Sequence, residues 1–156
     1  MGLFSFRTGA GNKVLSKKDE EKASAVSEDA VKKAKADAMM KAVEKLNLKI
    51  KDLSIDVKGD VVTAYGTAET QFDKELAILT LGNNADIRQV DDRISVVTPA
   101  PEATFYEVKS GDTLSKIAKA QYGDAKKYNV IFEANTPMLK DPNLIYPGQM
   151  LRIPKQ

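Results

Sequence analysis

The 156-residue sequence contains no cysteine and no histidine. Without cysteine there is no disulfide, and no redox compartment can be inferred. The two absences together exclude Cys–His nucleophilic pairs, Ser-His triads and the usual zinc sites. Only oxygen ligands remain for a bound metal, which favours hard cations.

An excess of charge of one sign is also missing. There are 24 Lys and Arg against 22 Asp and Glu, a formal net charge of +2. This balance gives no general attraction to nucleic acid or anionic lipid, so we expect neither nucleic acid nor a membrane as a partner. No stretch approaches the roughly 20 apolar residues of a membrane span.

The N-terminal stretch from Met1 to Phe6 is apolar but short. A secretory signal needs about 7–15 apolar residues after a basic start, and Arg7 follows the apolar run here. We therefore expect a cytoplasmic protein. A disordered tail would not need the large apolar residues Leu3, Phe4 and Phe6, so we expect this segment to dock on the rest of the chain.

A helix is predicted from Thr70, as its N-cap, to the loop Leu81–Ile87. Gly82 is expected to be the left-handed residue at the helix end, and Asn83 and Asn84 also tolerate positive φ. A helix end leaves carbonyls without partners and is partly negative. Such a loop could aim several carbonyls at a weakly hydrated monovalent cation. An ordinary helix stop before a strand explains the same residues.

The hydrophobic pattern predicts an α+β protein with two domains joined by a linker. Pro99 and Pro101 make the linker a semi-rigid spacer. Before the linker, the predicted elements are a helix from Ser27 to Leu46, strands over 53–58 and 61–65 joined by a type II′ turn at Gly59-Asp60, the helix from Thr70, and a strand through 90–96. The linker spans residues 98–103. After it, the predicted elements are a strand over 105–109, helices after Asp112 or Thr113 and before Asn135, a type II turn at Pro147-Gly148, and a strand over 150–153.

Residues 106–118, YEVKSGDTLSKIA, closely resemble the opening of a LysM domain. Residues 131–135, IFEAN, and 145–154, IYPGQMLRIP, match its middle and end. The resemblance implies a small βααβ LysM domain over 104–156. Residues 28–97 resemble a BON domain in their element order and in the sequence VDDRI at 90–94, which implies a helix/sheet sandwich preceded by a docking segment, residues 1–27.

A BON–LysM pair that follows the start MGLF resembles a family of bacterial cytoplasmic potassium-binding proteins. The resemblance implies selective binding of K+ by a ring of backbone carbonyls, as a K+ sensor or buffer. Carried over by position, these carbonyls belong to Arg7, Ala10 and Asn12 and to Gly82, Asn84 and Ile87. Arg7, Asn12 and Asn84 depart from the family in side chain, which matters little when the backbone is the ligand. Because the two groups of ligands lie far apart in sequence, we expect the ion to order the chain.

Two other functions compete with potassium binding. The LysM resemblance alone implies binding of peptidoglycan or other N-acetylglucosamine glycans between the loops Gly111–Thr113 and Met138-Leu139, although Gly111, Thr113 and Asn135 also suit turn, cap and helix-stop roles. An enzyme is least favoured, because the neighbouring carboxylates Asp91 and Asp92 would point to opposite faces of a strand. We expect a monomeric non-enzyme with K+ as its ligand and an unidentified protein partner that reads its state.

Overall fold

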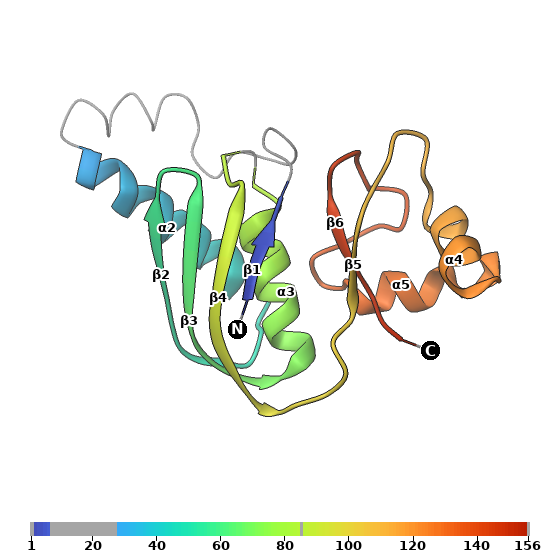
Figure 1. The fold of residues 1–156 in the computed structure, drawn as a ribbon, viewed down its shortest axis with the longest axis horizontal. Helices are drawn as coiled ribbons and strands as arrows, with labels where there is room; N and C mark the ends of the chain where they lie inside the picture. The colour runs from blue at the N-terminus through green and yellow to red at the C-terminus, as the bar shows by residue number, and fades with distance from the viewer. Residues whose placement is uncertain (1, 7–27, 85, 156) are drawn as a thin grey trace.

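The computed structural model describes residues 2–6, 28–84 and 86–155 (Figure 1). These residues form a four-stranded sheet in the order β1-β4-β3-β2 and a two-stranded sheet of β5 and β6. Helices accompany both sheets, which confirms the α+β class. The elements are β1 (Gly2–Ser5), α2 (Glu28–Glu44), β2 (Ile50–Lys58), β3 (Val61–Thr70), α3 (Gln71–Gly82), β4 (Gln89–Thr98), β5 (Thr104–Glu107), α4 (Leu114–Tyr122), the 3-10 helix η1 (Ala125–Lys127), α5 (Tyr128–Ala134) and β6 (Met150–Ile153).

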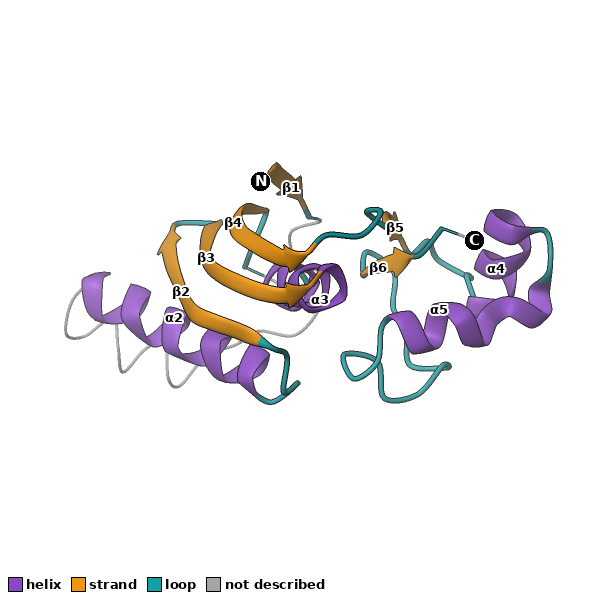
Figure 2. Ribbon diagram, turned by 90° about the horizontal axis from the view of Figure 1, so that it is seen from below, coloured by secondary structure: helices purple, strands orange, loops and turns teal. Residues whose placement is uncertain are grey.

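The larger sheet begins with the predicted hairpin of β2 and β3. Its register pairs Val57 with Val62 and Ile55 with Ala64, as the turn at Gly59-Asp60 predicts. β3 then continues into α3 and returns as β4, which lies parallel to β3. The Thr70 hydroxyl caps α3 by accepting from the Asp73 amide at 3.2 Å. Helices α2 and α3 both cover one face of this sheet (Figure 2).

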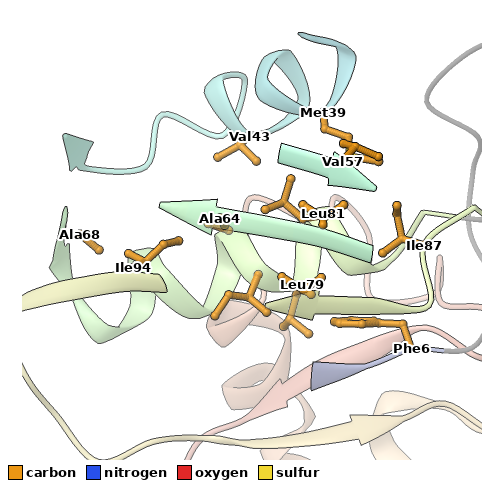
Figure 3. Close-up of a cluster of buried hydrophobic side chains, with 14 residues drawn as sticks. Phe6, Met39, Val43, Val57, Ala64, Ala68, Leu79, Leu81, Ile87 and Ile94 are labelled. Atoms are coloured by element: carbon orange, nitrogen blue, oxygen red, sulfur yellow. The ribbon is translucent and has the colours of Figure 1, made fainter. Parts of the chain in front are cut away.

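The buried core lies between these helices and the sheet (Figure 3). Alternate residues of the strands enter it, because successive side chains of a strand point to opposite faces. Asp92 is the polar exception in β4. Its carboxylate pairs with the ammonium of Lys74 at 3.0 Å, and both side chains are buried. The apolar members are Phe6, Met39, Val43, Val57, Val62, Ala64, Ala68, Ala77, Ile78, Leu79, Leu81, Ile87, Val90 and Ile94.

Strand β2 starts earlier than predicted because a bulge interrupts its alternation. The register shifts between Lys51 and Ser54, and Asp52 has a φ of 54°. The partly buried residues Ile50 and Leu53 are three positions apart, so the alternation typical of a strand does not include both. Helix α2 ends at Glu44 rather than at Leu46. The Leu46 and Asn47 amides instead form turns by donating to the carbonyls of Val43 and Glu44.

The smaller sheet and its helices enclose a second core of Val108, Leu114, Ile117, Ala118, Ile131, Leu139, Leu151 and Ile153. Thr113, not Asp112, caps α4 by accepting from the Lys116 amide. Gly148 has a φ of 89°, and the Gln149 amide donates to the Tyr146 carbonyl at 3.1 Å, which agrees with the predicted type II turn. The predicted domain boundaries remain a prediction. Among the helices that the structure describes, none has the length and apolar character needed to cross a bilayer.

Candidate functional site

The N-terminal segment forms a strand at the edge of the larger sheet, a pairing that the sequence analysis does not predict. β1 runs antiparallel to β4, with Gly2 opposite Asp92 and Ser5 opposite Gln89. The next residue, Phe6, donates its amide to the Arg88 carbonyl at 2.6 Å. Its ring is 6% exposed and lies at the edge of the core (Figure 3). The segment is therefore fixed beside the loop that ends α3.

Gly82 lies inside helix α3 and has no positive φ, so its predicted left-handed conformation is wrong. The cap residue is Asn83, with a φ of −80°, and Asn84 has no positive φ either, although asparagine tolerates one. Glycine is needed at position 82 for a different reason. A Cβ there would lie 2.0 Å from Cζ of Phe6, so the aromatic ring occupies the space of the missing side chain.

The carbonyls at the end of α3 are satisfied largely by two asparagines. The Asn83 amide donates to the Leu79 carbonyl at 2.8 Å. The side-chain amide of Asn84 donates to the carbonyls of Thr80 at 3.1 Å and Leu81 at 2.7 Å. Asn84 is buried, so its side chain holds the last turn of the helix together.

Of the six predicted carbonyl ligands, the structure describes those of Gly82, Asn84 and Ile87. Among the described residues, the Asn84 carbonyl accepts one hydrogen bond, from the Ile87 amide at 3.1 Å. No donor from residues 2–6, 28–84 or 86–155 bonds to the carbonyl of Gly82 or of Ile87. Arg7, Ala10 and Asn12 lie outside the described residues.

Asp86 lies in the same loop, and the sequence analysis does not single it out as a site residue. Its Oδ2 atom is buried and has no hydrogen-bond partner in the described part of the chain. The last turn of α3 contains no basic residue, and nearby Arg88 pairs instead with Asp60 at 2.9 Å. Within the described residues, the loop thus combines carbonyls without a donor, the negative end of a helix and a carboxylate oxygen without a partner, a donor set that fits a cation. The burial of this single oxygen atom cannot be read from the sequence.

Within the described ranges, no group of three or more Asp and Glu side chains is arranged to hold a metal ion.

Asn83 connects this loop to the C-terminal unit. Its side-chain amide donates to the Met150 carbonyl at 2.9 Å, and its side-chain oxygen accepts from the Met150 amide at 2.8 Å. The side chain of Asn83 thus bonds to both backbone groups of Met150 in β6, as a residue of a neighbouring strand would. Gly82 and Asn84 flank Asn83, so two of the predicted ligands are direct neighbours of the residue that bonds to β6.

A buried ion pair and an aromatic contact also hold the two units together. The Arg152 guanidinium donates to the Glu75 carboxylate at 2.7 Å, with both side chains less than a tenth exposed. Glu75 also accepts from the Ala103 amide at 3.1 Å. At the N-terminal edge, the ring of Phe4 in β1 lies 5.1 Å from that of Phe105 in β5.

The residues predicted to form the glycan groove make contacts within the protein. Asp112 accepts from the Tyr106 hydroxyl at 2.7 Å and from the Lys109 amide, and these bonds lower the pKa of its carboxyl. The same bond to Asp112 raises the pKa of Tyr106 to about 12. Asn135 is fully buried and uses its side chain on the Ile131 carbonyl and on both backbone groups of Arg152. Leu139 belongs to the core. These side chains therefore have structural roles.

The fold and its motifs define a protein in which a LysM domain follows an α+β unit. Residues 106–154 match the LysM domain family. Over 161 aligned positions that cover all of both proteins, the chain is 44% identical to potassium binding protein Kbp of Escherichia coli O6:H1. The chain therefore belongs to the Kbp family.

Other similar proteins share only part of their length with the chain. An uncharacterized protein of Deinococcus radiodurans is 53% identical over 51 residues, 33% of this chain and 19% of that protein. An esterase of Mycobacterium tuberculosis is 35% identical over 102 residues, 62% of this chain and 21% of the esterase. These partial matches carry no activity over to this chain.

Proposed function

We propose that the chain binds K+ in the cytoplasm and acts as a sensor or buffer of that ion. Membership of the Kbp family supports K+ as the ligand. The observation that carries the site is the loop after α3, where the carbonyls of Gly82 and Ile87 have no donor among the described residues and Asp86 has a buried, unpartnered oxygen. The ring would be completed by the backbone carbonyls of Asn84 and of Arg7, Ala10 and Asn12.

Isothermal titration of the purified protein with KCl, NaCl and MgCl2 tests this function. We expect tight binding of K+, weaker binding of Na+ and negligible binding of Mg²⁺, because Mg²⁺ releases its water shell reluctantly. Equal affinities for K+ and Na+ would refute a selective potassium site. Chitin oligosaccharides belong in the same titration, because the glycan-binding alternative predicts heat from them and not from potassium.

Asp86 is proposed to balance the charge of the ion. Asp86→Asn keeps the shape of the side chain and removes its charge, so we expect the affinity for K+ to fall about tenfold or more. Asp56→Asn is the matched control, because Asp56 is exposed on β2 and the same charge is lost. Titration of both variants with KCl measures the difference. Equal losses in the two variants would mean that net charge, not Asp86, matters.

Asn84→Ala tests whether the ion uses the backbone or the side chain at this position. The sequence analysis predicts an unchanged K+ affinity because the ligand is the carbonyl. The side chain nevertheless satisfies two helix-end carbonyls, so we expect unfolding to become easier by about 1–3 kcal/mol. Urea denaturation measures this cost, and titration of the folded variant measures affinity. A complete loss of binding by a fully folded variant would indicate side-chain ligation.

Potassium is expected to order the chain, because only one arrangement presents all the carbonyls together. At a hundredfold excess over the dissociation constant, binding would stabilise the folded state by about 2.7 kcal/mol. We expect a higher melting temperature and a smaller radius of gyration in potassium chloride than in choline chloride of equal ionic strength. Deletion of residues 2–12 should abolish the difference. Identical values for the intact chain in both salts would contradict the ordering.

The remaining parts of the functional hypothesis are proposals of the same kind. We propose a monomer without enzymatic activity, whose state is read by an unidentified protein partner. Two contacts support a partner that detects the bound ion. The N-terminal segment contacts the C-terminal unit through Phe4 and Phe105, and the loop after α3 contacts it through Asn83.

A further inference from the structure

A cavity of about 610 Å³ lies between the two units. It is bounded by the second half of α2, the C-terminal end of α3, and the loop that joins α5 to β6, elements that face one another in Figure 2. Its volume is typical of small-molecule sites. The cavity shares Met138 and Leu139 with the predicted glycan groove, but the loop Gly111–Thr113 is not among the described residues that line it.

The walls of the cavity are partly apolar. Ala38 and Ala42, one turn apart on α2, leave room beside the helix, and Tyr146 faces them from the other unit. Leu144 lies at the cavity with 66% of its surface exposed. A ligand with a ring or another apolar body would remove this surface from water.

Three lysines give the cavity a positive charge. Lys41 lies in the last turn of α2, Lys45 follows the helix directly, and Lys140 comes from the opposite unit. In the part of the chain that the structure describes, none of the three forms an ion pair and no Asp or Glu lines the cavity. Concentrated charge of one sign in a cleft attracts the opposite charge, and lysine is a common partner of phosphate.

Two polar groups of the lining lack partners. The side-chain oxygen of Gln149 and the hydroxyl of Thr80 are both buried without a hydrogen bond to any described residue. Gln149 as a whole is 5% exposed, and its backbone is held by Tyr146 and Val108. A buried amide oxygen needs a donor, which a ligand hydroxyl or amino group can supply once the Gln149 side chain turns toward the cavity.

We propose that this cavity binds a phosphate ester of a hydroxylated ring compound, the class that includes nucleoside monophosphates and sugar phosphates. The phosphate lies among Lys41, Lys45 and Lys140, and a ligand hydroxyl donates to Gln149. The site does not depend on the proposed potassium function. Asn83 and Asn84 nevertheless line it, so if the loop binds potassium, each ligand changes the affinity for the other by the same factor.

Equilibrium titration of the full chain with AMP, glucose 6-phosphate, adenosine and inorganic phosphate tests the proposal. We expect at least one ester to bind more tightly than both adenosine and free phosphate. Lys41→Ala/Lys45→Ala should weaken that binding by about tenfold or more. Lys32→Ala/Lys33→Ala is the matched control, because it removes two exposed lysines of α2 that do not line the cavity.

Three outcomes would overturn the proposal. They are the absence of binding by both esters at millimolar concentration, equal losses in the two double variants, and free phosphate binding as tightly as the esters. Titrations of the same variants with KCl keep the two functions apart. Absence of potassium binding by the parent chain, with ester binding intact, counts against the proposed potassium function alone.

Discussion

Gly82→Ala should displace Phe6 and weaken potassium binding about tenfold or more. The added Cβ would lie 2.0 Å from Cζ and 2.2 Å from both Cε atoms of Phe6, so the ring cannot stay where it is. Overpacking of this kind costs about 1–3 kcal/mol of stability. Because Arg7 follows Phe6 in the chain, the proposed ligands of the N-terminal segment would shift with the ring.

A double variant distinguishes this cause from the left-handed conformation that the sequence analysis predicts. Phe6→Leu removes the ring atoms that would collide, so Phe6→Leu/Gly82→Ala should be less destabilised than the two single changes predict when added. Strain at a positive φ would not be relieved by a change at Phe6. Gly111→Ala is the control, because Gly111 has a φ of 85° and nothing within 4 Å of an added Cβ. It should lose some stability and no potassium affinity, as measured by urea denaturation and KCl titration. Additive losses at positions 6 and 82 would contradict the packing explanation.

Local signals predict much of this fold. Thr70 and Thr113 lie where short-range capping places them, and β6 has the predicted bounds, Met150–Ile153. The register of β2 and β3 follows from one turn, since a two-residue turn fixes which residues face each other. Each of these features depends on residues only a few positions apart.

The features that the sequence does not predict depend on distant residues. β1 is too short for a periodic pattern, and its partner β4 lies more than eighty positions away. Glycine is typical of a helix end, but at position 82 it is required because the Phe6 ring occupies the space of a side chain. The pairing of Asn83 with Met150 spans 67 positions, and a lone asparagine after a helix suggests only a cap. At the candidate site, the family resemblance supplies the carbonyl positions, whereas the buried oxygen of Asp86 emerges only from packing.

Glu75→Ala should loosen the contact between the two units by about 3–5 kcal/mol, the cost of leaving a buried charge without its partner. The Arg152 guanidinium would remain nearly buried, held over the Phe72 ring at 5.1 Å and bonded to the Ala134 carbonyl at 2.9 Å. The amide of Ala103, the last residue of the predicted linker, would also lose its acceptor. We expect calorimetric unfolding to separate into two transitions, because each unit keeps its own core while their docking weakens.

Glu107→Ala is the matched control for that experiment, because it removes a carboxylate that pairs with Lys109 at 3.0 Å on the surface. Exposed ion pairs contribute about 0–1 kcal/mol, so its unfolding should stay close to that of the parent chain. The K+ affinity of Glu75→Ala should change less than its domain docking, since Glu75 lies in the first turns of α3 and the proposed ligands lie at the other end. Its radius of gyration should then respond less to potassium than that of the parent. Similar unfolding of Glu75→Ala and Glu107→Ala would mean that the buried pair does not hold the two units together, and the contacts of Asn83 and Phe4 would have to do so alone.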